Sequence, residues 1–276
     1  MPIPSEPPPL PWNYISKLVC IGDSGTGKSS LTIRLCESRF VNTHDVTIGV
    51  EFGSRIVPVG PPANAALHIN DPSSIHNGDT TGTTSSGIQR KGKDQQRLMK
   101  LSLWDTAGQE TYKSITRSYF RGASGALLVF DISRRSTFES ATAWLHDLRQ
   151  IAEENIVVIL VGNKSDLADK SSDAEGGNKR AVTKEEAEEW CKREGVMRYV
   201  ETSAKSGEGV ERAFLEVAER VYQNIEAGKY DLNDRRSGVK GYGTGGGREG
   251  GTAQKTVTLG MNDAMKAGQR GGGGCC

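Results

Sequence analysis

The chain has 276 residues, enough for one domain of ordinary size with additional tails. Its 35 basic and 34 acidic residues nearly cancel, so no charge excess favours nucleic acid as a partner, and 35% apolar residues with 34 glycines suggest a core diluted by disordered segments. No run of about 18 apolar residues predicts a membrane-spanning helix, and the start MPIPSEPPPLPW lacks the features of a secretory signal.

Predicted strands alternate with helical patterns along the chain. Apolar runs predict buried strands over residues 15–21, 98–105, 125–131, 156–162 and 198–203, with a further strand at 51–59. Capping boxes at Ser136–Glu139 and Thr183–Glu186 each open a helix, the second ending at Gly195. A last helix carries one apolar stripe, formed by Val210, Phe214, Val217, Val221 and Ile225. This order predicts an α/β fold, with a mostly parallel six-stranded sheet and helices on both faces.

Segments rich in Gly, Pro, Ser and Asn flank and interrupt this pattern. Residues 1–13 form a proline-rich extension, residues 14–229 form the domain, and residues 230–276 are predicted to be a flexible tail. Two disordered insertions are predicted, at about 60–97 and 168–179. The first separates two strands, so we expect it at the tip of a hairpin, where added length costs little free energy.

Three cysteines lie within apolar patterns: Cys20, Cys36 and Cys191. We expect them to be buried thiols. The spacing of the five cysteines matches neither a disulfide framework nor a zinc site.

A glycine-rich turn between a predicted strand and a predicted helix fits the Walker A phosphate-loop pattern. Backbone N–H groups of such a loop converge on phosphate, and the following helix directs its positive end there. The lysine is expected to bridge the β- and γ-phosphates and the serine after it to bind Mg²⁺. The predicted contacts are Gly22, Asp23, Ser24, Gly25, Thr26, Gly27, Lys28, Ser29 and Ser30. This motif alone does not distinguish ATP from GTP.

A second motif follows the strand at 98–105. Asp105 is expected to hold the magnesium, and the Gly108 N–H is expected to meet the γ-phosphate. Gln109 stands where a side-chain amide can orient an attacking water. This segment therefore predicts both a sensor of the terminal phosphate and, with Lys28, the catalytic residues.

Two further motifs predict the base. Asp166, in the segment Asn163–Lys164–Ser165–Asp166, can accept hydrogen bonds from guanine N1–H and its 2-amino group, whereas adenine offers no such pair of donors. An unpaired buried acceptor costs about 1–3 kcal/mol, which is the source of the discrimination. Ser203, Ala204 and Lys205 complete the site, with the Ala204 N–H predicted to donate to the guanine oxygen. The predicted nucleotide is therefore GTP or GDP.

With these motifs in this order, residues 14–229 resemble the Ras-like small GTPases, and within them the Rab family. The supporting blocks are IGVEF (48–52), KLSLWDTAGQE (100–110), YKSITRSYFRG (112–122) and LVFDIS (128–133). The segments HDVTIGVEFG and SITRSYFRGA are most similar to the Rab-two, Rab-four and Rab-fourteen branch. The resemblance implies the Ras-like P-loop GTPase fold.

The resemblance also implies roles that spacing alone does not give. Thr47 matches the switch threonine that joins Ser29 and Asp105 at the magnesium, and Phe40 matches the aromatic that packs against guanine. The effector-contacting positions are Ile48, Phe52, Trp104 and Tyr119. The first insertion departs from the family pattern, in which this hairpin is tight, so the resemblance does not carry over effector contacts along the hairpin.

The resemblance gives the last two residues a role as well. Cys275 and Cys276 match the ending that receives two geranylgeranyl groups in Rabs, and two lipid chains give stable anchoring. The implied partners are an exchange factor, a GTPase-activating protein, a GDP-dissociation inhibitor, the Rab escort protein with geranylgeranyl transferase, and effectors. The implied location is the cytoplasmic face of Golgi or endosomal membranes, with a cytosolic pool.

The predicted function is a switch that binds GTP with Mg²⁺, hydrolyses it slowly, and regulates vesicle traffic. Two alternatives stay open at this point. A nucleotide-locked module would recruit effectors without turnover, and a hydrolysis assay separates it from a switch. A metabolic P-loop kinase or ATPase would bind ATP, and competition between GTP and ATP for the site distinguishes such an enzyme from a GTP-binding switch.

Overall fold

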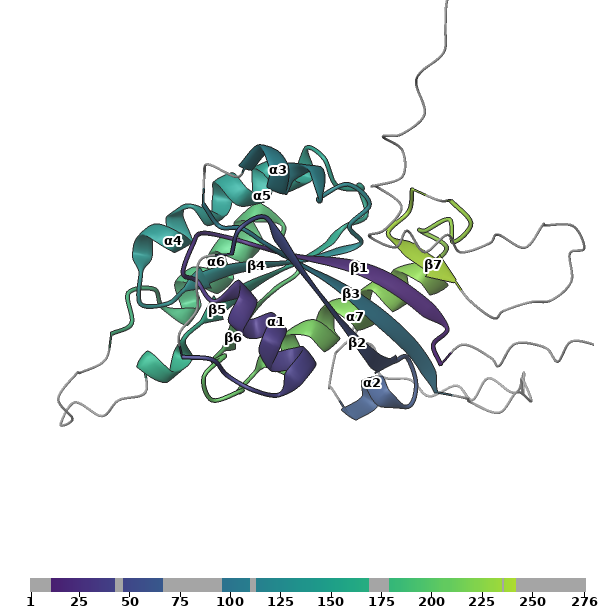
Figure 1. Cartoon of the computed structure of the whole chain (residues 1–276), viewed down its shortest axis with the longest axis horizontal. Helices are drawn as coiled ribbons and strands as arrows, with labels where there is room; N and C mark the ends of the chain where they lie inside the picture. The colour runs from purple at the N-terminus through teal and green to yellow at the C-terminus, as the bar shows by residue number, and fades with distance from the viewer. Residues whose placement is uncertain are drawn as a thin grey trace, which may run out of the picture. The chain divides into compact units, whose positions relative to one another are not determined.

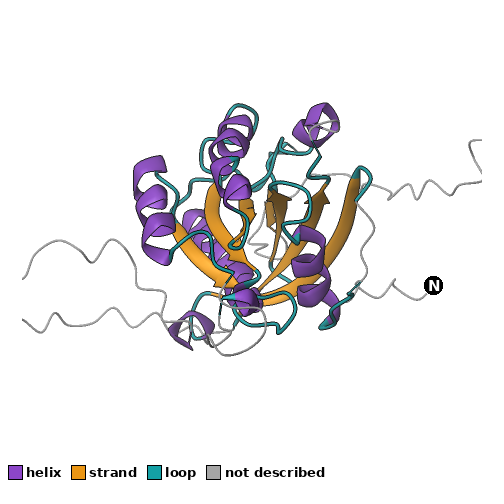
Figure 2. Cartoon of the chain, turned by 90° about the vertical axis from the view of Figure 1, so that its left-hand side faces the viewer, coloured by secondary structure: helices purple, strands orange, loops and turns teal. Residues whose placement is uncertain are grey.

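A twisted β-sheet with helices on both faces forms the centre of the protein (Figure 1, Figure 2). The computed structural model describes residues 11–42, 47–66, 96–109, 113–168, 179–234 and 236–241. Within them the strands are β1 (Tyr14–Ile21), β2 (Val50–Val59), β3 (Arg97–Thr106), β4 (Gly125–Asp131), β5 (Val157–Asn163), β6 (Arg198–Thr202) and β7 (Val239–Gly241). The helices are α1 (Lys28–Glu37), α2 (Ala63–Ala66), α3 (Lys113–Ser118), α4 (Arg135–Glu139), α5 (Ala141–Arg149), α6 (Lys184–Glu194) and α7 (Val210–Glu226), with a 3-10 turn, η3 (Ser165–Leu167). None of the helices in these ranges is both long and apolar enough to cross a bilayer.

The sheet confirms the predicted α/β class and places the site. The strand order is β2-β3-β1-β4-β5-β6, with β2 antiparallel to β3 and the other neighbours on this path parallel. Chain order reverses at β1, whose neighbours are β3 and β4. In open α/β sheets, ligands bind outside the carboxyl ends of the strands at such a reversal. The end of β1, where the phosphate loop begins, is therefore the expected binding crevice.

The structure corrects the strand count and the start of the tail. Strand β7 pairs antiparallel with the first residues of β1, with Val239 opposite Ser16. This edge of β1 is open because β4 begins to pair only at Leu18. Val239 is fully buried and Tyr230 nearly so. The prediction of a flexible tail from residue 230 is therefore wrong for the described residues up to 241, because β7 pairs with the open edge of β1 and Tyr230 and Val239 are buried in the core.

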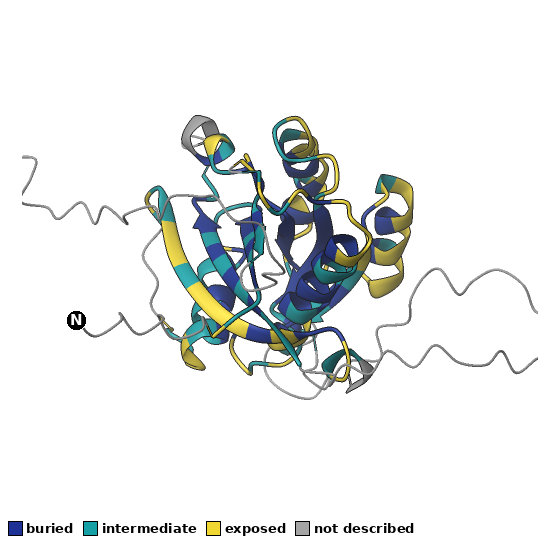
Figure 3. Ribbon diagram, turned by 90° about the vertical axis from the view of Figure 1, so that its right-hand side faces the viewer, coloured by how far each residue is buried: buried dark blue, intermediate teal, exposed yellow. Residues whose placement is uncertain are grey.

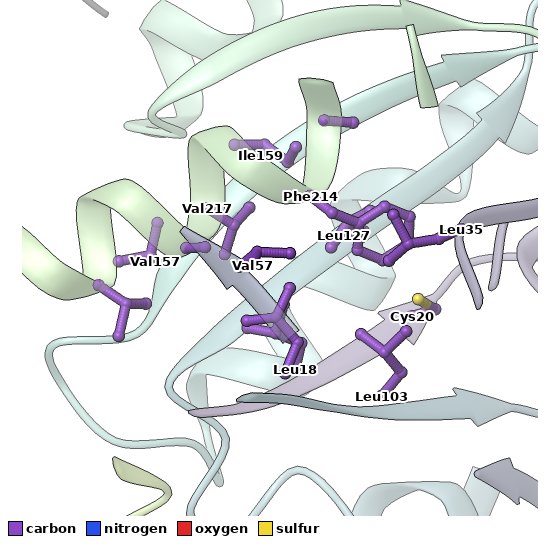
Figure 4. Close-up of a cluster of buried hydrophobic side chains, with 14 of the residues drawn as sticks. Leu18, Cys20, Leu35, Val57, Leu103, Leu127, Val157, Ile159, Phe214 and Val217 are labelled. Carbon is purple, nitrogen blue, oxygen red and sulfur yellow. The ribbon is translucent and has the colours of Figure 1, made fainter. Parts of the chain in front are cut away.

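Two apolar layers enclose the sheet, one on each face. Alternate residues of β1 point to opposite layers, Leu18 to one and Val19 to the other. Figure 4 shows the layer under α1 and α7, which includes Leu35, Phe214 and Val217. Full burial of a side chain of this kind contributes about 1.5–3 kcal/mol. The predicted apolar stripe of α7 is therefore confirmed as the main cover of this face.

The cysteines partly follow the prediction. Cys20 and Cys191 are buried free thiols, whereas Cys36 is only half-buried. Cys36 lies at the end of α1 beside Gly53 of the exposed edge strand β2, where the cover is thinner. Figure 3 shows the exposed residues along this strand.

One of the two predicted capping boxes is present. The Thr183 hydroxyl accepts a hydrogen bond from the Glu186 N–H at 3.2 Å, and Gly195 ends α6 in the left-handed conformation. The box at Ser136 is wrong, because α4 begins at Arg135 without a side-chain cap. The Thr137 hydroxyl instead ties the start of α4 to β4 by accepting from the Asp131 N–H at 3.0 Å.

The first insertion lies at the tip of the β2–β3 hairpin, as predicted, since Val59 pairs with Arg97. Its first residues are not structureless, because Glu219 of α7 accepts hydrogen bonds from the Gly60 N–H at 2.8 Å and the Asn64 side chain at 3.2 Å. Residues 67–95 and 169–178, which make up most of the two predicted insertions, lie outside the described residues. The same holds for residues 1–10 and for 242–276, with Cys275 and Cys276.

Candidate functional site

A cavity of about 450 Å³ opens at the carboxyl ends of the parallel strands, at the predicted crevice. Many of the predicted site residues line it: Ser24, Gly25, Gly27, Lys28, Ser29, Ser30, Phe40, Thr47, Gly108, Asn163, Lys164, Asp166, Ala204 and Lys205. Val41, Asn42 and Leu167 line it as well. Sequence reasoning missed these three because they are loop residues without a chemical signature.

The phosphate loop has the backbone that its glycines allow. Gly22 has φ +135°, and a Cβ there would lie 2.1 Å from the Val129 carbonyl oxygen. The Lys28 ammonium folds back into the loop and donates to the carbonyls of Gly22 at 2.9 Å and Asp23 at 3.0 Å. Burial lowers the pKa of Lys28, although nearby carboxylates act in the opposite direction. The loop thus places the Lys28 ammonium at the start of α1. Both the ammonium and the helix start favour an anion at this place.

The residues predicted to hold Mg²⁺ lie together and fit it. Both carboxylate oxygens of Asp105 are buried and lack a hydrogen-bond partner within the described ranges. The Ser29 and Thr47 hydroxyls are 2.8 Å apart, so Thr47 is already drawn to the start of α1. Burial raises the pKa of Asp105 to about 6, while the nearby Ser29 hydroxyl and Lys28 ammonium act against this rise. One carboxylate with hydroxyl oxygens is the donor set of a hard cation that keeps most of its waters.

No group of three or more His, Cys, Asp or Glu side chains in the described part of the chain forms a metal cluster.

Gly108 lies directly against the phosphate loop. A Cβ at Gly108 would lie 2.5 Å from the Lys28 ammonium and 2.5 Å from the Ser24 nitrogen. Only a residue without a side chain therefore fits between β3 and the loop. Gln109 follows it, half-exposed, and does not line the cavity.

Asn163 ties the two ends of the cavity together. Its side-chain amide donates to the Thr26 carbonyl at 2.8 Å, and its Oδ1 accepts from the Ala204 N–H at 3.1 Å and the Thr202 hydroxyl at 3.2 Å. In this structure the Ala204 N–H donates to Asn163, and its predicted donation to a guanine oxygen stays a prediction. A Cβ at Gly27 would lie 2.3 Å from the same amide, so the glycine is required for the contact.

Asp166, the residue predicted to select guanine, is held in place by Ser203. The Ser203 hydroxyl donates to Asp166 Oδ1 at 2.7 Å, which fixes the orientation of the carboxylate at the cavity wall. Lys164 lines the same end and adopts the left-handed conformation, with φ +70°. Its ammonium lies 2.7 Å from Asp131 Oδ2.

Asp131 is a site residue that sequence reasoning missed. Its Oδ2 also accepts from Arg134 Nε at 3.1 Å, and Arg134 Nη2 donates to the Ser24 carbonyl at 3.0 Å. Burial alone would raise the pKa of Asp131, but hydrogen bonds from Lys164 and Ser133 outweigh it and lower the pKa. This carboxylate therefore joins the lysine at the base end to the tip of the phosphate loop. Its position at the end of a buried strand, like that of Asp105, was the available signal.

The predicted aromatic surface is contiguous. The Phe52 and Trp104 rings, opposite each other on β2 and β3, have centroids 4.3 Å apart, and Tyr119 continues the row with its centroid 5.2 Å from Trp104. Phe52 is 65% exposed, and Ile48 before it is 80% exposed. The exposure of Ile48 and Phe52 leaves apolar area open to a partner, and the effector role of this row stays a prediction.

A comparison with protein families gives one match. The family model described as Ras family matches residues 17–77 and 74–223. The matched ranges run from β1 into α7 and include the cavity, the phosphate loop and the aromatic surface.

Proposed function

Because this chain belongs to the Ras family of small GTPases, whose members bind GTP and GDP and act as hydrolytic switches, we propose that it is a Rab-type regulator of vesicle traffic. The observation that carries the proposal is the single cavity that joins Lys28 and Ser29 at one end to Asp166 at the other. A triphosphate and a guanine need both ends at once. Rab-like sequence blocks and the row Phe52, Trp104 and Tyr119 support the Rab assignment within the family.

The proposed reaction is attack of water on the γ-phosphoryl group. A bond forms between the water oxygen and the γ-phosphorus, the bond to the β–γ bridging oxygen breaks, and GDP and phosphate leave. Lys28 and the loop N–H groups stabilise the charge on the transferred group, and Gln109 orients the water. Ser29, Thr47 and Asp105 are the residues that would hold Mg²⁺, which supplies further neutralisation of phosphate charge when bound.

The switch follows from two segments that share the phosphate end. Thr47 contacts Ser29, and Gly108 lies against Lys28, so both segments meet where the terminal phosphate binds. We propose that GTP holds both segments in place and that hydrolysis releases them, which changes the surface around Ile48 and Phe52. Regulation by an exchange factor, a GTPase-activating protein and effectors follows from family membership.

The Rab-specific partners are part of the proposal. They are a GDP-dissociation inhibitor, an escort protein and a geranylgeranyl transferase acting on Cys275 and Cys276, with delivery to the cytoplasmic face of Golgi or endosomal membranes. These assignments rest on the Rab resemblance of the sequence. Intact-mass measurement of the native protein tests the lipids, since two geranylgeranyl groups add a defined mass.

Nucleotide assays test the core of the proposal. GTP and GDP are expected to displace labelled GDP from the protein, whereas ATP is not, because Asp166 finds no pair of donors on adenine. Gln109→Leu is expected to bind GTP as tightly as wild type and to slow single-turnover hydrolysis by at least tenfold. Equal displacement by ATP would remove the guanine assignment. Absence of hydrolysis by the wild type, even with Rab GTPase-activating proteins added, would favour the nucleotide-locked module.

A further inference from the structure

We propose that Arg34 is a positioning residue that clamps the base end of the cavity and thereby sets how slowly bound GDP leaves. The inference rests on the proposed guanine-nucleotide function and deepens it. Arg34 does not line the cavity, so it acts through the loops that do.

The guanidinium of Arg34 joins three backbone carbonyls. Nε donates to the Ala204 carbonyl at 2.8 Å, Nη2 donates to the Lys205 carbonyl at 2.5 Å, and Nη1 donates to the Ser38 carbonyl at 3.1 Å. Ala204 and Lys205 belong to the loop at the base end. Ser38 begins the segment that leads to Phe40, whose ring centroid lies 6.0 Å from the guanidinium carbon. One side chain therefore holds both loops that wall this end.

The position of Arg34 on α1 connects this clamp to the phosphate end. Lys28 begins α1, and the face of the helix that carries Leu31 and Leu35 is buried in the core. Arg34 lies six residues after Lys28 on α1, which corresponds to about 9 Å along the helix axis. A rigid helix thus fixes the distance between the phosphate grip and the base clamp.

Arginine is required for this geometry. Its planar fork presents several N–H donors in fixed directions, so three carbonyls in different segments are satisfied at once. A lysine ammonium is a single point on a flexible stem and cannot span them. Hydrogen bonds to a charged donor are also stronger than those between neutral groups.

Release of the nucleotide requires the base end to open. The Ser203 hydroxyl orients Asp166, and Asn163 holds Ala204, so movement of this loop disturbs the selecting carboxylate as well. Loss of the Arg34 clamp should therefore accelerate release and weaken recognition of the guanine 2-amino group, while the phosphate contacts that support hydrolysis stay in place.

The test compares Arg34→Ala and Arg34→Lys with the wild type, using GDP with a fluorophore on the ribose and Mg²⁺ in excess. Arg193→Ala is the matched control, because Arg193 pairs with its neighbour Glu194 on the surface of α6. GDP is expected to leave about tenfold faster from Arg34→Ala and several-fold faster from Arg34→Lys. The control is expected to match the wild type. Single-turnover hydrolysis by GTP-loaded variants should stay within twofold of the wild-type rate.

A second measurement separates positioning from general loosening. Inosine diphosphate lacks the 2-amino group, so the ratio of its dissociation constant to that of GDP reports the grip of Asp166. The ratio should fall in Arg34→Ala and stay constant in Arg193→Ala. Unchanged GDP release in both Arg34 variants, equal effects at Arg193, or an unchanged ratio would overturn the inference. If the wild type failed to retain GDP, the proposed function itself would fail instead.

Discussion

Asp105 is placed for binding at a cost to folding. Its carboxylate oxygens are buried without a hydrogen-bond partner in the described structure, and burial raises its pKa from 3.8 to about 6. A carboxyl group whose folded-state pKa lies above its unfolded value destabilises the fold where it is ionised. The penalty is therefore full at neutral pH and shrinks as the pH falls through 6.

Replacement of this carboxylate should move folding and binding in opposite directions. Without Mg²⁺ and nucleotide, Asp105→Asn is expected to raise the free energy of unfolding at pH 7 by about 1–3 kcal/mol. With Mg²⁺ present, the same variant is expected to release GDP at least tenfold faster. Urea unfolding in a chelator and GDP release in Mg²⁺ measure the two effects. A loss of stability in the chelator would show that Asp105 has a structural partner rather than a cation.

Asp131 is the opposite case, a buried carboxylate whose partners stabilise its ionised form. Its pKa is lowered, so its contribution to stability is present above the ordinary value of 3.8 and is lost as the pH falls through the depressed value. Asp131→Asn is expected to cost about 3 kcal/mol at pH 7, because Lys164 and Arg134 lose the charge between them.

The pH dependence checks the assignment of Asp131. Urea unfolding measures the free energy of unfolding of wild type and of Asp131→Asn. The difference between the two free energies should be constant from neutral pH to about 5 and should become smaller below about 4. Glu139→Gln serves as the control, since its ion pair with Arg135 is exposed and should be worth under about 1 kcal/mol. A difference that stays constant down to the lowest pH would place the effect in packing rather than charge.

At the scale of elements, β7 extends the sheet at the end opposite the cavity. It pairs with Tyr14 to Ser16, whereas the phosphate loop follows the other end of β1. The backbone of Gly238, just before β7, packs against the backbone of Gly122, because a Cβ at Gly238 would lie 1.6 Å from the Gly122 carbonyl oxygen. The segment is therefore fitted to its edge and should affect stability more than nucleotide binding.

Truncation of the buried side chain of β7 tests this separation. Val239→Ala is expected to lower the free energy of unfolding by about 2 kcal/mol, while GDP release stays within twofold of wild type. Lys229→Ala, an exposed change in the same segment of the chain, should alter neither property. Unchanged stability in Val239→Ala would mean that β7 does not dock in solution.

At the scale of the whole molecule, the β2–β3 ladder separates the insertion from the site. Val50 pairs with Thr106 near the cavity, and Val59 pairs with Arg97 at the tip. Ten residues of strand span about 30 Å. Chain added at the tip is therefore compatible with an intact nucleotide site.

Shortening the insertion tests this independence. Replacement of residues 67–95 by a short Gly-Ser linker is expected to leave GDP release, hydrolysis and unfolding within error of wild type. Replacement of residues 61–95 should instead cost about 1–3 kcal/mol of stability, because the buried Glu219 loses the Asn64 side chain. Faster GDP release after replacement of residues 67–95 would contradict the independence of the nucleotide site from the insertion.

The sequence by itself determined the strands β1 to β6, the order of the motifs and most of the residues at both ends of the cavity. Each of these signals is local: an apolar run predicts a buried strand, and Gly22 to Ser29 predicts a phosphate loop within eight consecutive residues. The capping box at Ser136 shows the limit of local patterns, because the contact between Thr137 and β4 moved the start of the helix.

Only the tertiary structure decided how these parts hold one another. Arg34 and Ala204 are 170 residues apart in sequence, and Asn163 and Thr26 are 137 apart. The pairing of β7 with β1 and the ion pair between Asp131 and Lys164 likewise join separate segments. No local pattern encodes such contacts, because they form only when the sheet brings the ends of its strands together. Short motifs thus supply the chemical groups of the site, whereas hydrogen bonds between distant segments hold these groups in place.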